Sequence, residues 1–107
     1  MSVPLEHLTL HQMASGVNAL LLTERISWDE FPEYAAAVVG LIGGRLGPPI
    51  DSGGERVWRF DRNGLGYWIT WDDMDPGVTI EPCDQIAGAE IEAIRDVLLR
   101  SRGDAIA

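Results

Sequence analysis

The sequence predicts an α+β fold with two helices on one face of a mainly antiparallel sheet, in two layers. Two observations carry this prediction: alternating, aromatic-rich runs flank Asn63-Gly64, and apolar residues recur at helical spacing over 31–42 and 87–98. A sheet whose aromatic face packs on both helices buries all of these apolar stripes. A chain of 107 residues supports one core, so we expect a single domain over 1–107 with the order β-β-α-β-β-β-α.

A hairpin is expected near the N-terminus. Leu8 and Leu10 alternate with polar residues, and 17–23 is an apolar run rich in residues that favour strands. Ala14-Ser15-Gly16, which lies between these segments, is typical of a turn. A translation start at Met13 would remove the first of the two strands.

The first helix is predicted to begin at a capping box, in which Ser27 and Glu30 satisfy each other's backbone N–H groups. Pro32 has no N–H, so the first turn is expected to be irregular or the helix to start later. Gly43-Gly44 ends the helical pattern. The apolar face of this helix comprises Phe31, Tyr34, Ala35, Val38 and Ile42.

A Gly/Pro-rich loop over 45–55 is expected to lead into a central hairpin, because glycine and proline break regular elements. Asn63-Gly64 favours the positive φ angles of a two-residue type I′ turn. Strand side chains alternate, so this turn sets the register and puts the aromatic side chains on the core face. The predicted core-face pairs are Phe60 with Tyr67, Trp58 with Ile69, and Arg56 with Trp71.

A turn over 73–76 is expected to lead to a strand over 78–81. The apolar pattern selects the register of this strand: Ile80 lies beside Ile69 on the core face, whereas a shift by one residue would bury Thr79.

Asp84 is the predicted N-cap of a final helix, and Gly103 marks its end. Residues 102–107 are assigned to a C-terminal tail. The apolar face of this helix comprises Ala87, Ile91, Ile94 and Leu98.

The other sheet face is predicted to be open. Its centre is a transverse row in which Arg59 lies opposite Trp68, and Trp68 opposite Glu81. Aromatic and arginine anchors dominate the energy of protein interfaces, so an exposed Trp68 in this setting indicates a binding surface. The structural alternatives are a cation–π pair with Arg59 or burial under the N-terminal hairpin. The candidate binding residues are Arg59, Asp61, Trp68, Thr70, Asp72 and Glu81.

The net charge of the chain limits the classes of partner that it is expected to bind. With 17 acidic and 8 basic residues the net charge is −9, and nucleic-acid binding is disfavoured because it needs clustered basic groups. All basic residues are arginine, which removes the chemistry of Schiff-base and phosphate-loop lysines. An acidic surface suits a protein partner with a basic surface, or serves solubility alone.

The sequence contains no recognisable catalytic or metal-binding constellation. Cys83 is the only cysteine, and no motif brings it to His7 or His11. The acidic stretch 72–77 lacks the ligand spacing of a calcium loop. We therefore expect no enzymatic activity, no cofactor and no metal. The lone cysteine, with no signal peptide and no membrane-spanning apolar run, favours a cytoplasmic protein without a membrane partner.

Short motifs between 27 and 99 carry a resemblance to known proteins. They are Ser27-Trp28-Asp29-Glu30-Phe31-Pro32, Gly66-Tyr67-Trp68, Asp72-Asp73, Gly77-Val78 and Glu81-Pro82. This combination resembles small acidic bacterial α+β domains, some of which are immunity proteins that bind and neutralise a toxin. Because the motifs are caps, turns and core aromatics, the resemblance implies a fold and a binding role but assigns no functional residue.

Three functions remain open. The first is an immunity-type inhibitor that covers a basic site on a toxin with the acidic face around Trp68. The second is a small-ligand or enzymatic domain with a pocket between the sheet and residues 47–54. The third is a homodimer formed through the open face.

Overall fold

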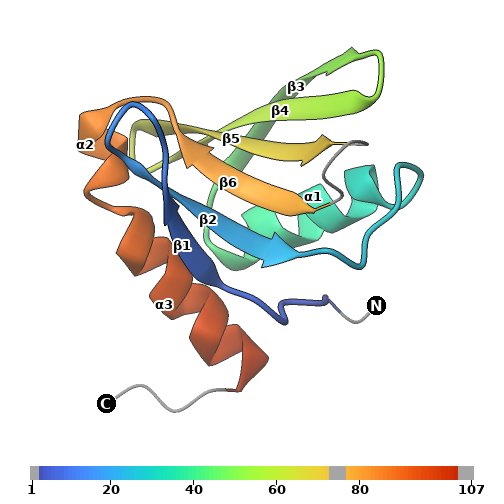
Figure 1. The fold of residues 1–107 in the computed structure, drawn as a ribbon. Helices are drawn as coiled ribbons and strands as arrows, with labels where there is room; N and C mark the ends of the chain where they lie inside the picture. The colour runs from blue at the N-terminus through green and yellow to red at the C-terminus, as the bar shows by residue number, and fades with distance from the viewer. Residues whose placement is uncertain (1–2, 73–76, 104–107) are drawn as a thin grey trace.

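The described residues form an antiparallel sheet of six strands and three helices, an α+β arrangement (Figure 1). The structure is a computed structural model that describes residues 3–72 and 77–103. Across the sheet the strands follow the order β1-β2-β6-β5-β4-β3. Along the chain the elements are β1 (Thr9–Gln12), β2 (Asn18–Thr23), α1 (Phe31–Leu41), β3 (Arg45–Ser52), β4 (Glu55–Arg62), β5 (Leu65–Asp72), β6 (Val78–Pro82), α2 (Gln85–Gly88) and α3 (Ile91–Arg102).

The N-terminal hairpin is confirmed. β1 pairs antiparallel with β2, and His11 lies opposite Ala19. The turn closes through two backbone hydrogen bonds, from Met13 N to Val17 O at 2.8 Å and from Gly16 N to Met13 O at 2.9 Å. Gly16 has a φ of 92°, a left-handed conformation that glycine adopts without strain.

The central hairpin has the register that the Asn63-Gly64 turn predicts. Asn63 and Gly64 have φ angles of 53° and 77°, as a type I′ turn requires. Phe60 lies opposite Tyr67, and their rings stack with centroids 5.1 Å apart. The other predicted pairs, Trp58 with Ile69 and Arg56 with Trp71, are also present.

β6 also takes its predicted register beside β5. Ile80 lies opposite Ile69 and Val78 opposite Trp71, so Thr79 falls on the other face. The turn expected over 73–76 lies outside the described residues.

The prediction of a loop over 45–55 is wrong, because β3 occupies Arg45–Ser52 and pairs with β4. The order along the chain therefore gains a strand that the sequence prediction lacked. β3 is an edge strand, in which every second N–H group faces away from the sheet, so proline at such a position leaves no ladder bond unmade. The register also shifts between Leu46 and Pro49, and such an irregularity relaxes the pairing at the prolines.

The first helix starts later than its capping box, as the position of Pro32 allowed. α1 begins at Phe31, with the proline in its first turn. The box itself forms: Ser27 N donates to Glu30 Oε1 at 3.0 Å, and Glu30 N donates to Ser27 Oγ at 3.3 Å. These bonds therefore close the turn that precedes the helix.

The single final helix that the sequence predicts is divided into α2 and α3. Asp84 caps α2, with its Oδ1 accepting from Ala87 N at 2.8 Å. α2 ends at Gly88, where an added Cβ would lie only 2.9 Å from Cγ1 of Val17. The close approach to Val17, the residue before β2, thus favours glycine, a weak helix former, in the middle of the apolar pattern. Gly103 ends α3 with a φ of 97°. Residues 104–107 of the predicted tail lie outside the described residues.

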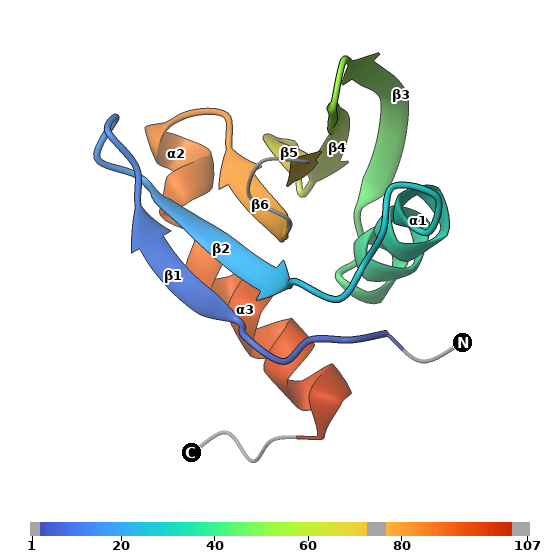
Figure 2. The same cartoon turned by 45° about the vertical axis from the view of Figure 1, so that its right-hand side comes forward.

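The core lies between the helices and one face of the sheet. Its buried side chains form one cluster that includes Phe31 of α1, Ala87 of α2, Leu98 of α3 and Ile69 of β5. Figures 1 and 2 show α1 near the β3 end of the sheet and α3 on the side of β1 and β2. The helices thus bury the aromatic face of the sheet, and the opposite face carries the candidate binding residues.

The N-terminal segment before β1 is fastened to this core by hydrogen bonds from two helices. Tyr34 Oη donates to the carbonyl oxygen of Pro4 at 2.7 Å, and Arg102 Nη1 donates to that of Leu5 at 2.8 Å. Leu5 and Leu8 are themselves buried. Among the described residues, no helix is long and apolar enough to cross a membrane.

Candidate binding face

The six candidate residues lie on one sheet face, opposite the core cluster. Arg59 pairs with Trp68 across β4 and β5, and Trp68 pairs with Glu81 across β5 and β6. This row is the one that the sequence predicts, from the hairpin turn and from the apolar pattern of 78–81. We define the binding face as the outward side chains of β3, β4, β5 and β6. Its candidate residues are Arg59, Asp61, Trp68, Thr70, Asp72 and Glu81.

Trp68 is half-buried, so its side chain is neither fully exposed nor fully covered. The guanidinium carbon of Arg59 lies 5.5 Å from the centroid of its ring, within the range of a cation–π contact. The same guanidinium lies 3.4 Å from Oδ1 of Asp61 through its Nη2. Arg59 and Trp68 therefore form a cation–π contact, which leaves part of the Trp68 ring open to a further contact.

Gly66 makes room for this arrangement. A Cβ at position 66 would lie 2.7 Å from the guanidinium carbon of Arg59, so a side chain there would require Arg59 to move. The backbone of Gly66 also binds the segment that follows β6, since Cys83 N donates to Gly66 O at 3.0 Å. Arg59 is thus held between Trp68 and the backbone of β5.

A shallow acidic hollow opens beside the row. It has a volume of about 210 Å³. Burial raises the pKa of Glu81 above its ordinary value, and the nearby carboxylate of Glu55 raises it further. Like charges are therefore gathered here at an electrostatic cost. The lining residues, which define the acidic hollow, are Glu55, Thr70, Asp72, Gly77, Thr79 and Glu81.

The sequence prediction missed one apolar residue of the face, Ile50. Ile50 of β3 lies opposite Val57, Val57 opposite Thr70, and Thr70 opposite Thr79. This second row runs from the sheet edge into the acidic hollow. Ile50 is 56% exposed, which is high for a large apolar side chain. Ile50 was missed because its segment was predicted to be a loop, and a residue can be assigned to a sheet face only when its strand is known.

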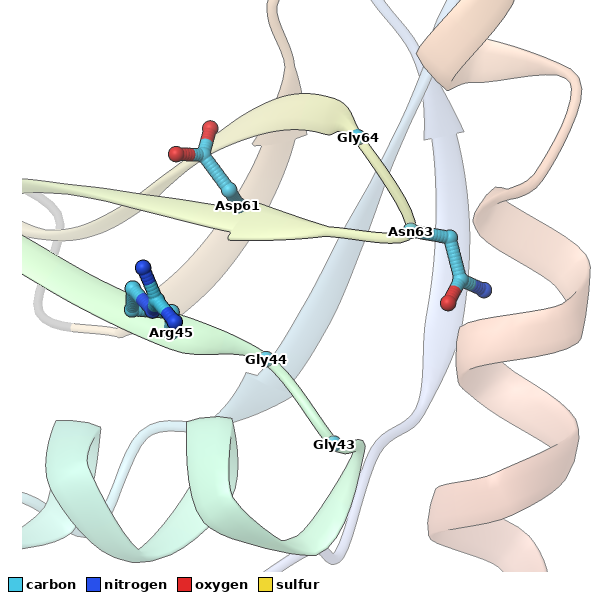
Figure 3. A pocket seen from close by; sticks show the side chains of 6 residues that line it. All are labelled: Gly43, Gly44, Arg45, Asp61, Asn63 and Gly64. Carbon is cyan, nitrogen blue, oxygen red and sulfur yellow. The ribbon is translucent and has the colours of Figure 1, made fainter.

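A second hollow, of about 400 Å³, lies at the other end of the hairpin (Figure 3). Arg45 and Asp61 enter it from neighbouring strands, while the side chain of Asn63 points away from them. Gly43 N and Gly44 N already donate to Gly40 O and Val39 O, so these amides are not available to an anion. The lining residues of this turn hollow are Gly43, Gly44, Arg45, Asp61, Asn63 and Gly64.

The face is therefore not uniformly acidic. Arg45 and Arg59 lie with Asp61 toward the Asn63-Gly64 turn, whereas three carboxylates lie around the acidic hollow at the opposite end. The charge changes sign along the strands. A partner that covers the face must have a matching gradient.

The candidate nucleophile is not activated. Burial raises the pKa of the Cys83 thiol; Asp84 and Asp61 raise it too, and Arg59 opposes them. A thiol with a raised pKa stays protonated at neutral pH, when it is a poor nucleophile. His7 pairs instead with Glu24, at 2.9 Å between Nε2 and Oε2.

Across residues 3–72 and 77–103, no group of three or more His, Cys, Asp or Glu side chains is placed to hold a metal ion. The described residues of the acidic hollow are carboxylates, hydroxyls and a glycine.

Comparisons of the chain with protein-family models, curated proteins and solved structures gave no significant match.

Proposed function

We propose that this protein is a non-enzymatic protein-binding domain, of the kind that immunity proteins exemplify. The binding face covers a basic site on its partner, and the partner is a toxin in the most concrete form of the proposal. The observation that carries it is the row of Arg59, Trp68 and Glu81 beside an acidic hollow, on the sheet face that the core leaves free.

Trp68 is the expected anchor of this interface. Interface energy concentrates on a few aromatic and arginine side chains in well-packed surroundings, and truncating such an anchor costs on the order of 2 kcal/mol or more. Arg59 holds the ring in one orientation, so little side-chain entropy is lost when a partner covers it.

Charge supports a basic partner. The chain carries a net charge of −9, and the carboxylates of Glu55, Asp72 and Glu81 lie on the proposed contact surface. Opposite charges steer association and raise its rate, an effect that salt weakens. A cytoplasmic location is part of the proposal, since the one cysteine forms no internal disulfide.

Self-association through the same face is the alternative of a homodimer. A two-fold axis along the strands would bring one acidic hollow toward another at an electrostatic cost, whereas an axis across the strands would bring it toward Arg45 and Arg59 of the second copy.

A small-ligand function has one observation in its favour, the turn hollow of about 400 Å³. This size falls within the range of ligand pockets, but its lining is polar. Stabilisation by a compound in a broad metabolite screen would support that alternative.

The proposal is tested by affinity capture from a lysate of the source organism, with bound proteins identified by mass spectrometry. Wild type, Trp68→Ala and Ile86→Ala are compared. Ile86 is 68% exposed on α2 and serves as an apolar control outside the face. A stoichiometric partner that binds wild type and Ile86→Ala, and binds Trp68→Ala about 30-fold more weakly, is the expected result. Capture of no protein, or equal capture by Trp68→Ala, contradicts the proposal.

A further inference from the structure

We propose that the partner inserts one lysine or arginine side chain into the acidic hollow and covers Ile50 with an apolar side chain of the same segment. This inference rests on the proposed binding function and specifies the chemistry that the face recognises.

The size of the acidic hollow suits a single side chain. Its volume of about 210 Å³ lies below the 300–1,000 Å³ that is typical of small-molecule pockets. It is open to the surface between β5 and β6, with Thr70 and Thr79 from adjacent strands on its floor. An extended side chain can therefore enter it from a protein that lies across the sheet.

The lining of the hollow selects a cation. Glu55, Asp72 and Glu81 contribute carboxylates, the two threonines contribute hydroxyl acceptors, and none of the described lining residues is basic. Burial and the carboxylate of Glu55 raise the pKa of Glu81, and a partner cation would favour its charged form and lower that pKa. An ammonium or guanidinium group offers several N–H donors to these oxygens.

A metal ion fits the same charges less well. Within the described part of the chain no three acidic side chains converge closely enough to ligate one. Metal ligands must lie about 2.0–2.6 Å from the ion, whereas an organic cation bridges carboxylates that are farther apart through N–H groups on different sides. The geometry therefore favours a basic side chain.

Ile50 supplies the apolar half of the surface. It is 56% exposed, and the row Ile50, Val57, Thr70, Thr79 connects it to the hollow. Ile50 and Thr70 are two strands apart, roughly 10 Å at the usual strand spacing. An extended partner segment that crosses the strands covers this distance in about three residues. The basic and apolar residues of the partner are thus expected about three positions apart.

The test is selection of a displayed library of random peptides against the intact wild-type chain. The enriched peptides are expected to carry a lysine or arginine about three positions from a large apolar residue. A synthetic peptide of the most enriched sequence should bind about tenfold more weakly to the double variant Glu55→Gln/Glu81→Gln, and more weakly to Ile50→Ser. Replacing its basic residue with norleucine should cause a similar loss.

The matched control is Glu92→Gln/Asp96→Asn, which removes two carboxylates from α3, away from the binding face. The net charge changes equally in both double variants, so this control should bind the peptide as wild type does if the affinity depends on the carboxylates of the hollow. Equal weakening in both would attribute the affinity to overall charge and overturn the inference. Enriched peptides without a basic residue, or no enrichment, would also overturn it.

The captured partner separates this inference from the function on which it rests. A partner that is lost with Trp68→Ala and weakened by Glu55→Gln/Glu81→Gln supports both. A partner that is lost with Trp68→Ala but unaffected by the double substitution leaves the binding function standing and overturns the inference. No captured partner together with no enriched peptide overturns both.

Discussion

The guanidinium of Arg59 occupies the space in which a side chain at Gly66 would lie, with its carbon 2.7 Å from the position of an added Cβ. Gly66 lies on β5, two residues before Trp68, and pairs with Asp61, the ion-pair partner of Arg59. The absence of a side chain at Gly66 thus leaves room for the guanidinium that contacts the ring of Trp68.

Gly66→Ala should displace Arg59 without unfolding the protein. The methyl group would collide with the end of a flexible side chain, which can move at small cost, so we expect the free energy of unfolding to change by about 1 kcal/mol or less. The readout is the NMR signal of the Arg59 Nε–H group, which lies beside the ring of Trp68 and should shift. Partner affinity should fall with it. An unchanged Nε–H signal would show that Arg59 does not rest on Gly66 in solution.

Tyr34→Phe should loosen the N-terminal segment. It removes the hydrogen bond to Pro4 O, a loss of about 1 kcal/mol in the free energy of unfolding, measured by chemical denaturation. Hydrogen exchange should speed up at the His7 amide, which donates to Leu22 O. Tyr67→Phe is the control, because its hydroxyl bonds to Ala87 O, away from this segment. Equal acceleration of the His7 amide in both variants would argue against a specific clamp.

Glu30→Gln should weaken the protein at neutral pH and have little effect in acid. The hydrogen bonds from Ser27 N and from the Ser27 side chain lower the pKa of Glu30 below its ordinary 4.5. A lowered pKa means that the charged form is favoured by folding, so its stabilisation is present above pH 4.5 and is lost as the pH falls through the lowered value. Thermal unfolding of both proteins from pH 3 to pH 7 measures the difference.

The control for this prediction is Glu33→Gln, a second acidic residue in the first turn of α1. It tests the electrostatic effect of the helix N-terminus without the capping bonds. If both variants lose the same stability at every pH, the capping box contributes nothing of its own.

The sequence predicted the central hairpin in full because local and long-range signals agree there. Asn63-Gly64 allows one tight turn, and a shift of one residue in either direction would move Phe60 and Tyr67 out of the core. The pair of Arg59 and Trp68 follows from that register, and Glu81 joins the row through the register of β6, which the apolar pattern of 78–81 selects. This part of the candidate site therefore needed no tertiary information.

The missed elements depend on tertiary contacts. β3 has two prolines and no alternating pattern, and it is ordered as a strand because β4 offers it an edge. Ile50 and Arg45 could not be placed on the binding face without it. The division of the last helix has the same origin, since the approach of Gly88 to Val17 involves two segments far apart in the sequence.

Glu81→Gln is expected to have the opposite effect on stability from Glu30→Gln. Burial and the charge of Glu55 raise the pKa of Glu81, so folding favours its protonated form. Its favourable contribution is fully present below pH 4.5 and is lost as the pH rises through the raised value. Glutamine mimics the neutral form, so the variant should be more stable than wild type at pH 7 and similar to it at pH 3, in thermal unfolding.

The same titration links stability to binding. A basic side chain in the acidic hollow stabilises the charged form of Glu81, so binding should weaken as the pH falls and the carboxyl takes up a proton. For the wild type, the affinity of the selected peptide should therefore drop between pH 7 and pH 4, measured by calorimetry. Glu81→Gln should show a weaker affinity and a smaller change over this range. A wild-type affinity that is constant with pH would mean that the partner's cation does not contact Glu81.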